Sequence, residues 1–519
     1  MKKIKQYLVI LSLALSGFSC TDYLDVRPEN QMLLDDFWQK ESDAEAVLLT
    51  CYRAMQEDAF MDRVMLWGEL RSDNAVATSS NNNDIKQINS VNILPTNPYC
   101  TWASFYTVIN YCNTVLKYAP LVVDRDPNFT EQDLLAKEAE ALAIRSLCYF
   151  YLVRAFRDVP LSLEATIGDD QTLEIPQSAP EAVLQQITDD LLQAEAGALS
   201  IYPTTRETKG RMTKDAIRAI LADVYLWKKE YGKCVEYCDK LINATAVSNS
   251  FGGMTVELPK YELIEDDMSS YDIFGNGNSS ESIFELQFST EKVNNSVVSL
   301  YGSSTATGHL TAAVNCAEVG TIFSEEDERR SDFIVVSSEA PYKIFKYLGS
   351  RMGGGGLSGY SYKQTTANWI FYRITDIMLM KAEALVQQQA SDDNLKEALH
   401  LVNTTYMRAN PTLLETDTLS FDNYGNATAM EKLVLLERQR ELMFEGKRWF
   451  DLVRHSERKA STGDLIDYVI AKYSDNLSTI TTKLSVLNAI YLPIPKGEID
   501  VNPLLKQNPY YESSSNIEK

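Results

Sequence analysis

The chain has 519 residues, of which 45% are hydrophobic and 10% aromatic, and its 49 Lys and Arg against 72 Asp and Glu give a net charge of -23. This length exceeds one ordinary hydrophobic core, so it predicts several domains or one large repeat architecture. The charge argues against nucleic acid as a partner, because phosphate binding needs clustered Lys and Arg, and the apolar content excludes a disordered acidic chain.

The N-terminus predicts an export signal. Lysines at positions 2, 3 and 5 precede an apolar run, Leu8 to Leu15, which is too short to span a bilayer as a stable helix. Cys20 follows where bacterial lipoprotein signals place a cysteine, and the segment resembles such a signal although Phe18 and Ser19 depart from the usual pattern. We therefore expect a signal peptide over residues 1–19 and a lipid such as palmitate on Cys20. The alternative is an ordinary signal peptide with a chance cysteine.

Residues 43–243 predict a helical scaffold that follows an anchored segment, residues 20–42. Between Glu138 and Phe156, apolar residues recur with helical spacing, and the following Asp-Val-Pro ends the pattern. Thr213 is a candidate N-cap for the next helix, and a break at Tyr231 leads into another. Two helices joined by so short a turn form an antiparallel hairpin.

Residues 244–369 predict a loop-rich insertion, because they hold 13 of the 23 glycines. One strand is expected there, since Phe284, Leu286 and Phe288 alternate with polar residues. Residues 79–84 form a second polar loop among the N-terminal helices. Binding residues tend to lie on such irregular segments of a rigid scaffold.

A second helix pair, Ile370 to Gln389 and Leu395 to Met407, predicts that residues 370–519 are a C-terminal helical scaffold with an extended tail. The fold class we expect is mainly α, a tetratricopeptide-like scaffold of helix hairpins whose partly β insertion forms a ligand face. The repeat period is not a clean 34 residues, so an irregular bundle is the alternative. Residues 20–519 are expected to form one compact unit.

No catalytic residue, metal site or cofactor is predicted. Nucleotide-cradle, metalloprotease and nucleophile-elbow motifs are absent in a fitting context, and the three histidines are scattered. Cys234 and Cys238 resemble half a zinc site but lack a second pair, so they are expected in the core, and the seven cysteines after Cys20 leave at least one free thiol. Acidic runs such as Glu325 to Glu328 are interpreted as solvated surface rather than a glycosidase pair.

The segment Glu437 to Arg454 combines charged and large apolar residues. Its acids and arginines at i, i+3 spacing predict local ion pairs: Glu437 with Arg440, Arg438 with Glu441 and Glu445 with Arg448. A basic partner-binding helix is one interpretation. The nearly balanced charges favour a core helix.

These patterns occur together in a known family. The chain resembles the SusD/RagB-like nutrient-uptake lipoproteins of the Bacteroidetes outer membrane. The resemblance rests on blocks that span the chain after Cys20: residues 22–29, 67–74, 138–160, 282–285, 372–384, 437–454 and 492–509.

The resemblance implies a non-catalytic, surface-exposed protein that is lipid-anchored in the outer membrane and binds oligosaccharides. It implies a SusC-like TonB-dependent transporter as the partner, over which the lipoprotein acts as a lid. A peptide ligand within the same kind of uptake system is one alternative. A helical-repeat scaffold of an envelope assembly is another.

Aromatic and planar polar side chains are the candidates for ligand contact, because sugars stack on aromatic rings and bind planar polar groups. Trp102 and Trp449 lie in predicted helices and are assigned to the core. The candidates are aromatic residues of the insertion and polar residues near the loop at 79–84: Tyr271, Phe274, Tyr301, Tyr360, Tyr362, Arg71, Asp73, Asn74 and Asn81.

Overall fold

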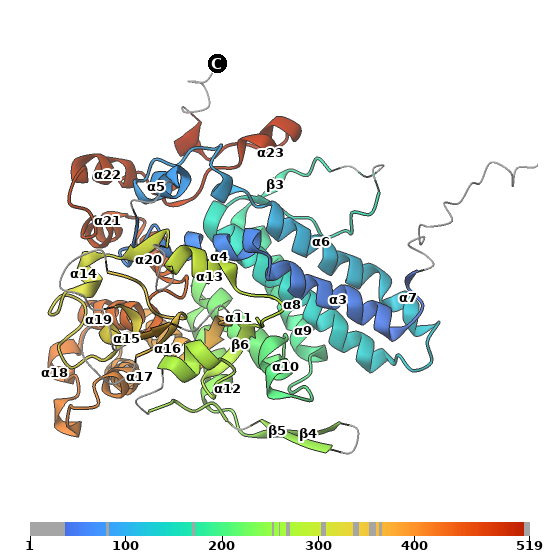
Figure 1. Cartoon of the computed structure of the whole chain (residues 1–519), viewed down its shortest axis with the longest axis horizontal. Coiled ribbons are helices and arrows are strands. Elements are labelled where there is room, and N and C mark those ends of the chain that lie inside the picture. The colour runs from blue at the N-terminus through green and yellow to red at the C-terminus, as the bar shows by residue number, and fades with distance from the viewer. Residues whose placement is uncertain are drawn as a thin grey trace, which may run out of the picture.

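The computed structural model describes residues 37–78, 82–168, 171, 173–251, 254–258, 260–265, 270–302, 308–335, 342–351, 360–362 and 366–512. The signal peptide, Cys20 and Asn81 lie outside these ranges. The predicted class is correct: the protein is mainly helical, with short strands at separate places on a helical frame (Figure 1).

Helix α8 is the centre of the N-terminal half and packs against α3, α6 and α9. It runs over Glu131–Phe156, so it begins one to two turns before the predicted start and ends where predicted. Thr130 and Asp133 cap its N-terminus with a reciprocal capping box. Almost every residue of its second half is buried, which gives α8 contacts on all sides. The helices of this half are α3 (Glu41–Met55), α4 (Asp58–Glu69), α5 (Asn83–Asn89), α6 (Ala103–Tyr118), α7 (Pro120–Val123), α9 (Pro180–Gly197) and α10 (Thr205–Gly210).

The predicted hairpin is confirmed as α11 (Lys214–Trp227) and α12 (Tyr231–Ile242). The side chain of Thr213 accepts a hydrogen bond from the backbone N–H of Ala216 and caps α11. The hairpin packs on α16 (Ile374–Gln388), so it joins the two halves of the chain.

Five two-stranded antiparallel sheets occur in the described part of the chain: β1 (Ala75–Ala77) with β7 (Leu310–Ala312), β2 (Val159–Pro160) with β3 (Gln177–Ser178), β4 (Val247–Phe251) with β5 (Met254–Leu258), β6 (Ser282–Leu286) with β10 (Trp369–Arg373), and β8 (Gly349–Arg351) with β9 (Tyr360–Tyr362). The alternation predicted for β6 is wrong in one respect, because Glu285 is as buried as its apolar neighbours. Its carboxylate accepts hydrogen bonds from the Asn278 N–H and the Asn368 side chain, which replace water. Short helical segments between the strands are η3 (Tyr271–Asn276, a π-helix), α13 (Asn295–Tyr301), α14 (Val314–Ala317) and α15 (Arg329–Phe333).

The C-terminal half repeats the hairpin pattern with two corrections. Ile370 belongs to strand β10, so the helix predicted from that residue begins at Ile374. The segment expected as one helix, Glu437 to Arg454, contains a turn, which lies between α19 (Ala427–Leu442) and α20 (Arg448–Lys459). The other helices here are α17 (Asp392–Ala409), α18 (Phe421–Tyr424), α21 (Gly463–Ile470), α22 (Leu477–Leu484) and α23 (Lys496–Val501).

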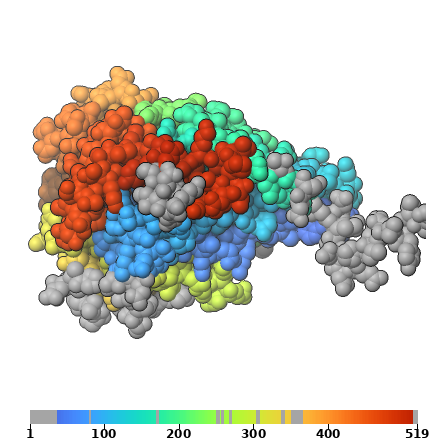
Figure 2. All heavy atoms as spheres, turned by 90° about the horizontal axis from the view of Figure 1, so that it is seen from above, coloured from blue at the N-terminus to red at the C-terminus, as the bar shows by residue number. Residues whose placement is uncertain are grey.

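The C-terminal tail returns to the N-terminal half. The backbone N–H of Leu492 donates to Ala155 O at 2.8 Å, and that of Lys496 donates to Pro95 O at 2.9 Å. Seen from above, the tail occupies the middle of one face beside N-terminal segments (Figure 2). Among the described residues, no helix has both the length and the apolar composition that crossing a membrane requires.

Candidate ligand-binding surface

Three of the polar ligand candidates lie in the interior, where they connect the two halves of the chain. The guanidinium of Arg71 donates to Ile490 O at 2.6 Å and Ala489 O at 2.5 Å and lies 4.2 Å from the ring centroid of Trp449. Asp73 accepts from Arg448 at 2.8 Å, and Asn74 donates to Glu69 at 2.8 Å. Since Arg71, Asp73 and Asn74 are nearly inaccessible, their polar groups hold the fold together. Asn81 lies outside the described residues.

Two of the aromatic candidates are also buried. The Tyr301 hydroxyl donates to Phe444 O at 2.7 Å, and the Phe274 ring packs edge-on against Tyr347 at 5.1 Å. Trp102 and Trp449 are buried, as predicted. The burial of Phe274 and Tyr301 leaves their rings no free face for a sugar.

The remaining aromatic candidates lie close together. Tyr271 is half-buried on η3, and its ring lies across Gly275. Strand β8 contacts η3 and pairs with β9, which carries Tyr360 and Tyr362. We call η3 together with the β8–β9 hairpin the η3 surface. Four of the five aromatic candidates thus lie on these elements, although Phe274 of η3 points into the core.

Three planar amides, of Asn278 just after η3 and of Gln287 and Asn368, form a group that the sequence did not predict. The amide of Asn278 donates to Gln287 Oε1 at 3.1 Å and accepts from Gln287 Nε2 at 2.9 Å. Asn368 donates to the same Gln287 oxygen at 3.0 Å and to Glu285 at 2.8 Å. Asn278 and Gln287 are half-exposed, so this rigid amide cluster can offer hydrogen bonds to a ligand. The sequence places Gln287 on the predicted strand. It does not show that Asn278 and Asn368 meet Gln287, because they lie elsewhere in the chain.

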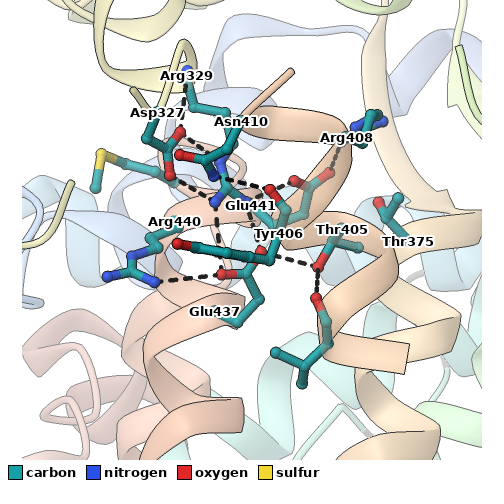
Figure 3. A network of polar contacts seen from close by, with 12 residues as sticks. Asp327, Arg329, Thr375, Thr405, Tyr406, Arg408, Asn410, Glu437, Arg440 and Glu441 are labelled. Atoms are coloured by element: carbon teal, nitrogen blue, oxygen red, sulfur yellow. Dashed lines mark hydrogen bonds and ion pairs between the residues drawn. The ribbon is translucent and has the colours of Figure 1, made fainter. Parts of the chain in front are cut away.

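Charged residues of α19 form a buried network with Arg329 and Arg408 rather than a reactive site (Figure 3). Arg373 donates to Glu441 at 2.6 Å and to Glu445 at 2.8 Å, and Arg329 donates to Glu437 at 2.7 Å. Burial alone would raise the pKa of Glu441, but Arg408, Arg373 and Arg329 outweigh it and hold that pKa well below its usual value. A carboxylate that stays ionised cannot act as a proton donor, so this network stabilises the fold.

Two of the three predicted local ion pairs are wrong. Glu437 and Arg440 do approach each other at 3.6 Å, as predicted. Arg438 instead pairs with Asp376 and Asp451, each at 2.9 Å. Glu445 and Arg448 are separated by the turn and start of α20, and they pair with residues of other segments: Glu445 with Lys346 and Arg373, and Arg448 with Asp73. Side chains that point into the core find partners from other elements, which sequence spacing does not reveal.

The predicted solvated run Glu325 to Glu328 is wrong at Asp327. Its carboxylate is buried and accepts from Arg329 at 2.7 and 2.9 Å, whereas Glu325 and Glu326 are exposed. The guanidinium compensates the loss of water around Asp327.

The cysteines behave as core residues, as predicted. All seven in the described part of the chain are free and buried, and the sulfurs of Cys234 and Cys238 lie 4.0 Å apart on α12. Over the same residues, no group of three or more His, Cys, Asp or Glu is arranged to hold a metal ion.

The helix hairpins and the loop-bearing η3 surface define a tetratricopeptide-like scaffold protein. Two family models match the chain: the SusD family over residues 324–511, and a family described as starch-binding and associating with the outer membrane over residues 22–226. The chain belongs to the SusD/RagB family.

Individual relatives match along nearly the whole chain. A SusD-like protein of Formosa agariphila is 27% identical, and the match covers 88% of this chain and 92% of the relative. The crystal structure of a SusD homologue from Bacteroides thetaiotaomicron is 21% identical with a TM-score of 0.73, covering 93% of this chain and 99% of that one. A laminarin-binding SusD-like protein is 22% identical with a TM-score of 0.67, covering 91% and 100%. These solved structures confirm the fold.

Proposed function

We propose that this protein is a cell-surface lipoprotein that binds oligosaccharides without cleaving them. In this proposal it passes them to a SusC-like TonB-dependent transporter, over which it acts as a lid. The observation that carries the proposal is the match of both SusD-type family models, one of them described as starch-binding, to the two halves of one chain. Lipid on Cys20 would anchor the protein in the outer membrane.

The η3 surface has the chemistry that oligosaccharide binding needs. Tyr271 supplies an aromatic ring for the C–H face of a sugar, strand β9 carries Tyr360 and Tyr362, and the cluster around Asn278 and Gln287 supplies planar hydrogen-bonding groups. The net charge of -23 disfavours anionic polysaccharides. Neutral glucans are therefore the first ligands to test, and a neighbour in the fold is itself named for laminarin binding.

Isothermal titration of the mature protein against starch-derived and laminarin-derived oligosaccharides, and against peptides, tests the ligand class. We expect Tyr271→Ala, Tyr360→Ala and Tyr362→Ala each to weaken glucan binding by about five- to a hundredfold, the range that one lost aromatic contact produces. Tyr424→Ala is the matched control, because Tyr424 is a half-buried tyrosine on α18. Release of shorter sugars, or binding of peptides alone, would contradict the proposal.

The partner and the anchor need separate measurements. Co-purification of the membrane-extracted protein with a TonB-dependent transporter tests the partnership. Cys20→Ser should move the protein from the membrane fraction to the soluble fraction while leaving glucan affinity unchanged. Membrane retention of Cys20→Ser would contradict the lipid anchor.

A further inference from the structure

A pocket of about 740 Å³ lies between the start of α6 and the C-terminal tail. Trp102 and Tyr106, at the start of α6, line it with their rings edge to face at 5.8 Å. The segment around Leu173 forms one wall, and the tail around Val501 forms the other. None of these residues belongs to the η3 surface.

The walls of this pocket are fixed by hydrogen bonds. Asn110 of α6 donates to Thr166 O at 3.0 Å and accepts from the Thr166 N–H at 2.7 Å. Asn502 of the tail donates to Ile175 O at 2.9 Å. The pocket therefore keeps its shape without a ligand, which is typical of binding sites.

The rim is unusually apolar for a protein surface. Val501 is 71% exposed and Leu173 is 63% exposed, and they are two of the three most exposed large hydrophobic residues of the described chain. Both line this one pocket. Exposed aliphatic groups that gather at a preformed hollow indicate an interaction site.

The charge of the lining indicates what would bind. It contains Glu174 and Glu498 but no Lys, Arg or His, and neither carboxylate forms an ion pair within the described residues. The amide of Gln171 already bonds to Ala165 O and to the N–H groups of Ile167 and Gly168, and Asn502 holds the tail. With an aliphatic rim and two carboxylates in its lining, the pocket suits an apolar group next to a positive charge.

We propose that this pocket is a docking site for an extended polypeptide segment of a partner protein that presents a large apolar side chain next to Lys or Arg. The apolar side chain enters over the half-buried ring of Tyr106, between Leu173 and Val501. The basic residue pairs with Glu174 or Glu498. The site is separate from the η3 surface, so it does not depend on which ligand that surface takes.

Fluorescence anisotropy with a labelled peptide of alternating Leu and Lys tests the proposal on the mature protein. Leu173→Ser/Val501→Ser should weaken binding by about tenfold or more, because two aliphatic contacts are lost. Glu174→Gln/Glu498→Gln should weaken it by about three- to tenfold and reduce its salt dependence. Peptides of alternating Ser and Lys or Leu and Glu should bind at least about tenfold more weakly.

Leu414→Ser/Leu477→Ser is the matched control, since both leucines are exposed and lie outside this pocket. We expect the control to bind the Leu–Lys peptide as the unmodified protein does. Equal binding by the control and the pocket variants would overturn the proposal in favour of general attraction to an acidic surface. Loss of glucan binding in Leu173→Ser/Val501→Ser would overturn it in favour of a sugar site.

Discussion

Arg373 shows how individual charged residues are used in this protein. It is almost inaccessible, and its guanidinium contacts Glu281, Glu441 and Glu445 as well as the Thr375 hydroxyl. Removing water from such groups costs free energy that only close pairing offsets. Arg373 and its three glutamates therefore stabilise the fold only together. Loss of Arg373 would leave uncompensated negative charge in the core.

We predict that Arg373→Met lowers the free energy of unfolding by about 3–5 kcal/mol, because Glu441 and Glu445 lose a shared cation in the interior. Urea unfolding followed by circular dichroism measures the change. Arg53→Met is the control, since Arg53 and Glu57 form a 3.7 Å pair in which both side chains are 53% exposed. An exposed pair contributes about 0–1 kcal/mol, so equal losses in the two variants would contradict the argument.

Glu69 predicts a pH dependence of stability. Burial raises its pKa to about 7, although hydrogen bonds from Asn74 and from the backbone N–H groups of Phe444 and Gly446 oppose the shift. Because the folded-state pKa is raised, the contribution of Glu69 to stability is full below its unfolded pKa of about 4.5. It is lost as the pH rises through about 7.

The difference in unfolding free energy between the unmodified protein and Glu69→Gln reports the titration of Glu69. The contributions of the other titrating residues are the same in both proteins and cancel. We expect the unmodified protein to lose stability relative to the variant between about pH 5 and pH 8. Chemical unfolding at intervals across that range gives the curve. A constant difference, or a relative gain at high pH, would show that Glu69 stays ionised in the fold.

At the scale of elements, Gly68 of α4 approaches the turn before α20 more closely than any other described glycine approaches its surroundings. A methyl group added at Gly68 would lie 1.7 Å from Gly446 O, and Gly446 itself has a positive φ of 70°. The helix and the turn meet here backbone to backbone, so neither can yield by moving a side chain. This contact holds the turn between α19 and α20, within the segment Glu437 to Arg454 that the sequence predicted as one helix.

We predict that Gly68→Ala destabilises the protein by about 1–3 kcal/mol or more, the usual range for overpacking. Gly497→Ala in α23 is the matched change, because a Cβ there meets nothing within 4 Å. That variant should be neutral or more stable by about 0.5–1 kcal/mol, through helix propensity and a restricted unfolded chain. Thermal unfolding of both proteins compares them, and a stable Gly68→Ala would mean that α4 can shift.

Local patterns predicted elements well and contacts poorly. The Thr213 cap and the end of α8 at Phe156 depend on residues next to them in the chain, so the sequence identified them. The partners of Arg438 and Glu445 come from segments far away, and i, i+3 spacing therefore assigned them wrongly. The ligand candidates Arg71, Asp73, Asn74, Phe274 and Tyr301 were wrong for a related reason. They are buried, and sequence spacing does not show burial.

At the scale of the whole molecule, the two halves of the chain share one interior. Arg71 binds the carbonyl groups of Ala489 and Ile490, while Asp73 pairs with Arg448. Helix α12 packs against α16. Arg71 and Asp73 therefore keep their partners only when both halves are folded together.

We therefore predict that the mature protein unfolds in one cooperative transition and that residues 37–243 do not fold alone. In the isolated segment Arg71 and Asp73 would lose their partners, and the face of α12 that packs on α16 would meet water. Scanning calorimetry of the mature protein should give a calorimetric enthalpy equal to the van't Hoff enthalpy. Near-ultraviolet circular dichroism should show no fixed aromatic packing in the segment. Two resolved transitions, or a sharp transition for residues 37–243, would mean that the shared contacts are weaker than the cores of the separate halves.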